Sequence, residues 1–291
     1  MVPFELLPGG AERCSVGGCT YVVTRLRPGA LLVSVHGDDR GAAGDWIFER
    51  LGAEARRFAR PLRLFVDLRE ARGAAPLVQE SWTAFFRERR SLLERVTLLT
   101  AEPWTKLVVA IARHLAGAEG WIDSSNDPAA FSEAIGGRQP ALQLEAKALP
   151  LSLERAAGAV EIAGAGASFR IERLAPGVLG VRVAGADAGE LPCLVFDAVE
   201  EMAGAGRYAL FIDASAATEV HPPARELWTA WLTAQRQRLD AVHSLVRHRY
   251  LQLTVGTVHE LSRTGDRMQV HADPASFERA RASRVAARVR P

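Results

Sequence analysis

The stretch WTAFFRERR at residues 82–90 returns almost unchanged as WTAWLTAQR at residues 228–236. Two further pairs of segments keep the same offset of 146 residues: LFVDLREA (64–71) with LFIDASAA (210–217), and NDPAAF (126–131) with ADPASF (272–277). Agreement in several segments at one fixed spacing indicates an internal repeat. The sequence therefore predicts a tandem duplication.

The repeat continues upstream with a slightly different spacing. RLRPGALLVSVHG (25–37) matches RLAPGVLGVRVAG (173–185) at an offset of 148 residues. Length changes are tolerated best in surface connections, so we expect the slip of two residues in the first helix of the unit or its loops. The two units are predicted at residues 19–136 and 167–286. The segment between them, 137–166, is rich in Ala, Gly and Pro and is expected to be a linker, with room for a short strand or a helical turn.

Each unit shows the periodicity of alternating strands and helices. A hairpin is expected first, because Pro28-Gly29 suits the centre of a type II turn, where glycine accepts a positive φ. In the first unit we expect strands at 21–26, 30–35, 62–68, 95–100 and 120–123, and helices at 45–59, from Pro76 to about Leu93, from Pro103, and after Asp127. In the second unit we expect strands at 168–174, 178–184, 207–213, 241–247 and 267–271, and helices at 188–204, 222–240, 249–263 and 273–285. The predicted fold class is α/β: each unit has a mixed, mostly parallel five-stranded sheet with an N-terminal hairpin and about four helices.

Composition limits the classes of function. Hydrophobic residues make up 48% and charged residues 24% of the chain, which is typical of a globular protein. No apolar run approaches the roughly 18 residues that cross a bilayer, and the N-terminus lacks the pattern of a signal peptide. A cytoplasmic location is therefore expected, without a membrane partner. The net charge of +2 is far below that of a dedicated nucleic-acid binder.

This order of elements resembles the STAS domains, the anti-sigma-factor-antagonist or SpoIIAA-like family. The residues that carry the resemblance are LFVDL, WTAFF, RVTLLT and DPAAF, with their partners in the second copy. Phosphoregulated members carry an Asp-Ser-Ser-Gly-like turn just before the helix that follows the central strand. Here that place reads DLREARGAAP (67–76) and DASAATEVHPP (213–223), and only the second contains hydroxyls, at Ser215 and Thr218. The phosphoswitch therefore does not carry over.

The residues that end the two central strands are the candidate ligand or partner surface. Asp67 and Asp213 are expected at the carboxyl ends of these strands, where ligands bind in open α/β sheets. Arg69 and Ser215 follow them and complete the candidate surface. The alternative is that the carboxylates bind loop N–H groups or stabilise a neighbouring helix N-terminus.

Four matched aromatic residues are expected in the core, namely Trp82, Trp228, Phe65 and Phe211. The tryptophans lie on the helices that should cover the central strands. Truncating such a residue to alanine typically costs about 3–5 kcal/mol. A ligand-stacking role is the alternative for the tryptophans.

No cofactor or metal site is expected. Three cysteines, Cys14, Cys19 and Cys193, neither form a disulfide framework nor have metal-ligand spacing. The spacing of the histidines in the second unit fits no common metal pattern; they are His243, His248, His259 and His271. The stretch HGDD (36–39) could suggest acid–base chemistry, but its counterpart AGAD (184–187) lacks the histidine.

These observations favour a non-enzymatic protein-interaction module in bacterial regulation. Its protein partner is unidentified, and the two repeats could pack on each other as a pseudo-dimer or be displayed side by side. The alternative is a small-ligand-binding or enzymatic protein that uses the carboxyl edge of the sheets near Asp67 and Asp213. A third possibility is that one unit has become a scaffold for the other.

Overall fold

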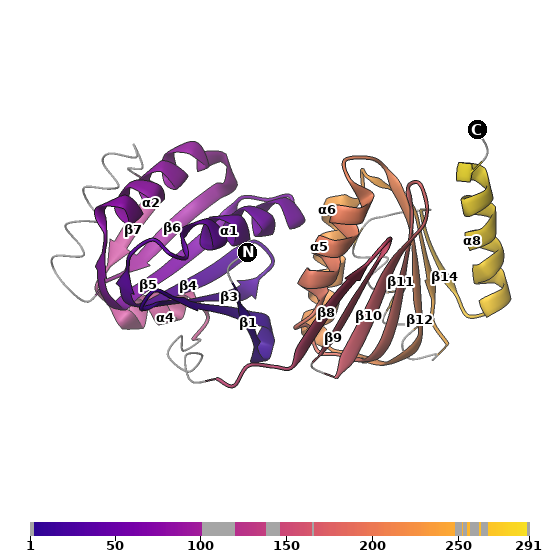
Figure 1. The fold of residues 1–291 in the computed structure, drawn as a ribbon, viewed down its shortest axis with the longest axis horizontal. Helices are drawn as coiled ribbons and strands as arrows, with labels where there is room; N and C mark the ends of the chain where they lie inside the picture. The colour runs from indigo at the N-terminus through magenta and orange to yellow at the C-terminus, as the bar shows by residue number, and fades with distance from the viewer. Residues whose placement is uncertain are drawn as a thin grey trace. The chain divides into compact units, whose positions relative to one another are not determined.

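The computed structural model describes residues 3–100, 120–137, 146–164, 166–247 and 267–289, together with the single positions 252, 255, 256 and 262. The chain splits into two compact units, Met1–Ala148 (unit 1) and Leu149–Pro291 (unit 2). Figure 1 colours unit 1 from indigo to magenta and unit 2 from magenta to yellow. Within the described residues, no helix is both long and apolar enough to span a membrane.

Unit 1 contains one seven-stranded sheet whose strands follow each other in chain order. The strands are β1 (Glu5–Leu7), β2 (Ala11–Val16), β3 (Cys19–Arg27), β4 (Ala30–Asp39), β5 (Leu62–Ala74), β6 (Leu93–Leu99) and β7 (Ile122–Ser125). The pairs from β1 to β4 are antiparallel, and the pairs from β4 to β7 are parallel. The expected hairpin is confirmed as β3–β4, and Gly29 in its turn has a φ of 77°.

Unit 2 repeats this topology in full. Its strands are β8 (Leu151–Ala156), β9 (Ala159–Gly164), β10 (Ala167–Ala175), β11 (Val178–Asp187), β12 (Tyr208–Val220), β13 (Leu239–Leu245) and β14 (Met268–His271). They also pair in chain order, antiparallel from β8 to β11 and parallel from β11 to β14. Each unit therefore has the mixed sheet, N-terminal hairpin and alternating helices that the SpoIIAA-like resemblance implies.

The sheets are larger than the five strands expected from the sequence. An additional antiparallel pair precedes the hairpin in each unit, β1–β2 in unit 1 and β8–β9 in unit 2. The segment 137–166, expected to be a linker with a short strand or helical turn, instead contributes two strands to the sheet, β8 and β9; residues 138–145 and 165 lie outside the described residues. These strands give a weak signal in the sequence because they contain Ala, Glu and Gly, which are depleted in strands.

Helices cover both faces of each sheet. In unit 1, α1 (Gly44–Arg57) and α2 (Pro76–Glu88) contribute to the large core cluster on one face, and α4 (Pro128–Ala134) packs on the other. In unit 2, α5 (Pro192–Ala203) and α6 (Pro222–Gln235) lie on one side of the sheet and α8 (Pro274–Val289) on the opposite side (Figure 1). Each crossover advances one strand in the same direction, so right-handed connections put successive helices on one face. The helices expected after Pro103 and at 249–263 lie outside the continuous described segments.

The offset between the two units changes by two residues within the first helix, as the sequence predicts. Helix α1 has 14 residues and its counterpart α5 has 12. The Asp127 side chain caps α4, as expected, by accepting hydrogen bonds from the backbone N–H groups of Ala129 and Ala130.

The matched tryptophans line the core without being fully enclosed by it. Trp82 is partly buried and packs edge-on against Phe48 at 5.0 Å between ring centroids. Trp228 is also partly buried, whereas Trp231, one helical turn later, is fully buried. Phe211 is fully buried and Phe65 is partly buried, so the core prediction holds best for Phe211.

Candidate functional site

Asp67 lies inside β5 rather than at its end. The strand continues to Ala74 beside β4, while β6 stops at Leu99, directly opposite Asp67. Asp67 therefore sits at a step in the sheet, at the carboxyl end of its neighbour, and its counterpart Asp213 sits opposite Leu245 in the same way. The prediction that both aspartates end the central strands is corrected accordingly.

The carboxylate of Asp67 is held by Arg69 from the same strand. The Arg69 Nε and Nη2 atoms donate to the two carboxylate oxygens at 2.9 and 2.7 Å, and the Arg69 backbone N–H donates at 3.2 Å. Asp67 is only 6% exposed. The hydrogen bond to Asp67 raises the pKa of Arg69, which keeps its positive charge. Both oxygens of the expected ligand site are therefore already engaged.

Asp213 has a different environment. Its carboxylate accepts a hydrogen bond from the Ser215 backbone N–H at 3.0 Å. Arg182, on the neighbouring strand β11, lies opposite Asp213 with 4.0 Å between the nearest charged atoms. The Asp213 side chain is 30% exposed. Thr218 lies further along β12 and is exposed.

Asp213 is the last member of a row of charged side chains across five strands of unit 2. The strand registers place these residues directly opposite one another, in the order Glu154, Glu161, Arg170, Arg182 and Asp213. We call them the charged row. Glu161, Arg170 and Arg182 are 52%, 45% and 57% exposed, and Arg170 forms an ion pair with Glu161.

The charged row lies on the face of the sheet opposite α5 and α6. Arg155, the residue after Glu154, forms an ion pair with Glu201 of α5 and so defines the helix-covered side. Alternation along the strand then points Glu154 to the other side. Helix α8 packs on the same side of the sheet, against β13 and against Ala175 and Val178 of β10 and β11. We call the part of this side around the charged row, where the charged side chains are exposed, the open face of unit 2.

The equivalent side of unit 1 is apolar and covered. A cluster of Leu7, Ala11 and Val22 is buried there, with Ala146 packed against it. Val22 holds the position of Arg170, and Arg13 of the same sheet donates to the Ala146 backbone oxygen at 3.1 Å. Ala146, near the end of unit 1, thus packs on a face whose counterpart in unit 2 carries the exposed charged row.

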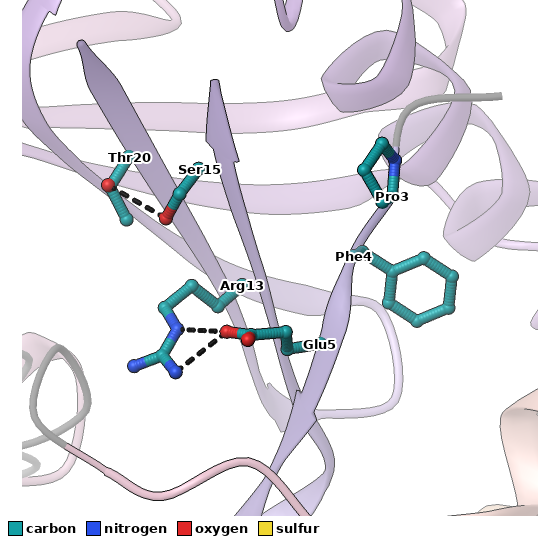
Figure 2. Close-up of a pocket in the computed structure, with 6 residues that line it drawn as sticks. All are labelled: Pro3, Phe4, Glu5, Arg13, Ser15 and Thr20. Atoms are coloured by element: carbon teal, nitrogen blue, oxygen red, sulfur yellow. Dashed lines mark hydrogen bonds and ion pairs between the residues drawn. The ribbon is translucent and has the colours of Figure 1, made fainter. Parts of the chain in front are cut away.

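A hollow of about 410 Å³ lies beside this cluster, over β1–β3. Figure 2 shows its polar lining: Glu5 is paired with Arg13 at 2.7 Å, and the hydroxyls of Ser15 and Thr20 lie 3.0 Å apart. Pro3 and Phe4 complete the wall. These polar groups bind one another, and unit 2 has Glu161 where unit 1 has Arg13, so the hollow is not a shared site.

Two aspartates within the HGDD and AGAD stretches are buried, which the sequence reasoning did not predict. Asp39 and Asp187, the last residues of β4 and β11, are 4% and 2% exposed. Asp39 accepts hydrogen bonds from the Tyr21 hydroxyl and the Gly41 backbone, and Asp187 accepts from Trp228 Nε1 at 3.3 Å and from the Gly189 backbone at 3.1 Å. Burial raises the pKa of Asp187 to about 6. The signal was present at the offset of 148, where HGDD and AGAD share their glycine and final aspartate.

Two histidines come together in unit 2 although 28 residues separate them in sequence. His243 Nδ1 lies 3.0 Å from His271 Nε2, and His271 Nδ1 lies 3.1 Å from the Ser276 hydroxyl. His243 also stacks on Phe211, with 4.7 Å between ring centroids. Burial, with smaller effects from His271 and Arg284, lowers the pKa of His243 to about 4. The other two histidines of interest, His248 and His259, lie outside the described residues.

The remaining candidates with reactive side chains, the three cysteines and His36, are buried or partly buried. All three cysteines are buried and none is in a disulfide. Burial raises the pKa of Cys19 to about 12, so its thiol stays protonated. His36 is partly buried, and burial lowers its pKa as well. In the part of the chain that the structure describes, no group of three or more His, Cys, Asp and Glu side chains is placed to hold a metal ion.

Comparison with known proteins gives limited help. No protein-family model matches the chain, and no curated protein matches it. Among solved structures, the chain is similar to an uncharacterized protein of the DUF3478 family with a SpoIIAA-like fold from Shewanella loihica. That match has 11% identity and a TM-score of 0.34, and it covers 42% of this chain and 96% of the other. At this TM-score it carries no argument, so the fold rests on the strand order of the two sheets.

Proposed function

We propose that this chain is a non-enzymatic protein-interaction module built from two SpoIIAA-like units. The observation that carries the proposal is the open face of unit 2, where a sheet presents the charged row to solvent. Binding sites for small molecules are concave and largely apolar. A sheet face lined by exposed charges suits a protein partner, because charge complementarity gives specificity and speeds association.

The alternative, a small ligand at Asp67 and Asp213, has less support. The oxygens of Asp67 already bind Arg69, and Asp213 differs from it in exposure and in partner. A ligand site inherited by both copies would be expected to keep the same arrangement in both. A ligand present at a hundredfold its dissociation constant adds about 2.7 kcal/mol of stability. A thermal-shift screen of metabolites and nucleotides therefore tests this alternative directly.

The interaction proposal is tested with the tagged full-length chain as bait at low ionic strength. A variant with Arg170→Glu and Arg182→Glu reverses the centre of the charged row. The control variant exchanges Arg155→Glu and Glu201→Arg, an ion pair on the helix-covered side. We expect a protein that binds the wild type and the control but not the row variant, and that rebinds from purified components. Turnover of a substrate that is lost in Asp67→Asn or Asp213→Asn would overturn the proposal.

A further inference from the structure

The charged row contains two like-charged pairs that face each other directly. Glu154 lies opposite Glu161 on β8 and β9, and Arg170 lies opposite Arg182 on β10 and β11. Like charges in opposite positions of a sheet are unfavourable. Read across the four strands, the signs are negative, negative, positive and positive. When a second copy of this row is rotated by 180° about an axis parallel to the strands, each negative position of one row faces a positive position of the other.

We propose that the partner of the open face is a second copy of this chain, an inference that rests on the proposed function. The two-fold axis runs along the strands, above the boundary between β9 and β10. This axis sets Glu161 against Arg170 and Glu154 against Arg182 of the second copy, each contact occurring twice. A two-fold interface requires a self-complementary patch, and the row provides one.

On the side of the row away from Ala175 and Val178, the neighbouring residues are small enough for two such faces to approach. One neighbouring register line consists of small side chains only, namely Ser152, Ala163, Ser168 and Ala184. The same axis sets Ala163 against Ser168 and Ser152 against Ala184 of the second copy. No bulky group on this line holds the charged side chains apart. Asp213 falls beyond the edge of the second sheet and keeps Arg182 as its neighbour.

The opposite side of the same strands shows the contrast. There the side chains are apolar and buried under α5, including Ile162, Phe169 and Ile171. A face intended only for solvent has no need of charges ordered by sign across four strands. The ordering is what distinguishes a second copy from an arbitrary acidic or basic partner, which would require a row of one sign.

Two variants of the full-length chain test the proposal. One carries Glu154→Arg and Glu161→Arg, which makes the four positions basic; the other carries Arg170→Glu and Arg182→Glu, which makes them acidic. Each should be monomeric alone by sedimentation velocity, and the two mixed together should form a one-to-one heterodimer. The wild type should form a homodimer whose dissociation constant rises at least about tenfold between about 0.1 M and about 1 M salt, because the Debye length falls from about 10 to about 3 Å.

A matched pair of controls keeps the result interpretable. The exchange of Arg155 and Glu201 described above alters charge on the helix-covered side and should leave the dimer unchanged. A variant with all four changes inverts the row and should dimerise again, because the inverted row is also self-complementary; heterodimer formation by the mixture shows that the single-sign variants are folded. A wild type that stays monomeric, a dimer that survives in either single-sign variant, or a mixture that fails to associate overturns the proposal. If those results occur while a different protein is still captured through Arg170 and Arg182, the proposal of a second copy is wrong but the proposal of an interaction module is retained.

Discussion

Arg182 and Asp213 face each other on neighbouring parallel strands of unit 2, and Ser34 and Asp67 hold the same two positions in unit 1. The shared aspartate therefore has an arginine neighbour in both copies, but from different places. In unit 1 the arginine is Arg69, two residues further along the same strand; in unit 2 that position is Ser215. The side chain of Asp67, held by Arg69, is 8% exposed, whereas that of Asp213 is 30% exposed.

The first prediction concerns Arg69→Ala. Removing this side chain leaves the buried Asp67 carboxylate without its charged partner, and breaking a buried pair typically costs about 3–5 kcal/mol. Because Arg69 keeps 34% of its side chain exposed, we expect about 2–3 kcal/mol. Arg182→Ala, which removes the exposed partner of Asp213, should cost less than about 1 kcal/mol. Urea unfolding, followed by peptide-resolved hydrogen exchange in each unit, measures the loss of unfolding free energy in the two variants. Equal losses in Arg69→Ala and Arg182→Ala would contradict the prediction.

The second prediction concerns a backbone approach that both units share. A Cβ atom at Gly37 would lie 2.3 Å from the backbone oxygen of Gly18, and one at Gly185 would lie 2.2 Å from that of Gly166. Both glycines also have positive φ, 87° and 83°. Gly37→Ala should therefore destabilise unit 1, and Gly185→Ala unit 2, by about 2–4 kcal/mol.

A matched control for these variants is Gly206→Ala, where an added Cβ meets nothing within 4 Å. We expect this change to alter the free energy of unfolding by less than about 0.5 kcal/mol. Peptide-resolved hydrogen exchange assigns each loss to its unit. The backbone argument fails if Gly37→Ala and Gly206→Ala behave alike.

The third prediction concerns the dependence of unit 2 stability on pH. Asp187 has a pKa raised from 3.8 to about 6, so its contribution is complete below pH 3.8 and is lost as the pH rises through about 6. His243 has a pKa lowered from 6.5 to about 4, so its contribution is complete above pH 6.5 and is lost as the pH falls through about 4. The two effects oppose each other in one pH window, and each amounts to about 3 kcal/mol at most.

Single variants separate the two effects. In Asp187→Asn the histidine effect remains, so unit 2 should gain stability relative to the wild type as the pH rises from about 4 to about 6. His243→Thr installs the residue found at the unit 1 counterpart, Thr97. In this variant only the aspartate effect remains, so unit 2 should lose stability relative to the wild type as the pH rises over the same range. Measuring the difference from the wild type at each pH cancels the other titrating groups. Curves that stay parallel to the wild type would refute the assignment.

The fourth prediction ranks two tryptophans of α6. Trp231 is 0% exposed, stacks on Phe196 at 4.6 Å and donates to Glu200 at 2.8 Å, whereas Trp228 is partly buried. Trp231→Ala should therefore cost about 4–5 kcal/mol and Trp228→Ala about 2–3 kcal/mol. Urea unfolding of the two variants checks the order. A larger loss for Trp228 would point to a greater role for its bond to Asp187 than its burial suggests.

Much of the fold could be predicted because the duplication presents the same pattern of strands and helices in two related sequences. The hairpin, the Asp127 cap and the place of the two-residue slip follow from local rules for turns, caps and helix periodicity. The matched tryptophans were the obvious choice for the core, yet Trp231 is the more deeply buried residue. Its counterpart in unit 1 is Phe85, so a search for identical residues passed over it.

The candidate site was less accessible to sequence reasoning. Asp67 and Arg69 were named together as a candidate ligand or partner surface, and in the structure they bind each other. Arg182 was not named, because its relation to Asp213 depends on the register of two parallel strands separated by a helix. Glu161 was missed because residues 137–166 were expected to be a linker, and Arg170 because its place beside Glu161 depends on the pairing of β10 with that unpredicted strand.

The sequence by itself determined the duplication, the order of strands and helices, and the apolar residues that each strand buries. These properties depend on composition and spacing along the chain, which a single sequence displays directly. Only the tertiary structure decided the size of the sheets, the partners of the buried carboxylates, the meeting of His243 and His271, and the alignment of the charged row. Each of these depends on strand register, and register sets distances between residues that the sequence alone leaves far apart.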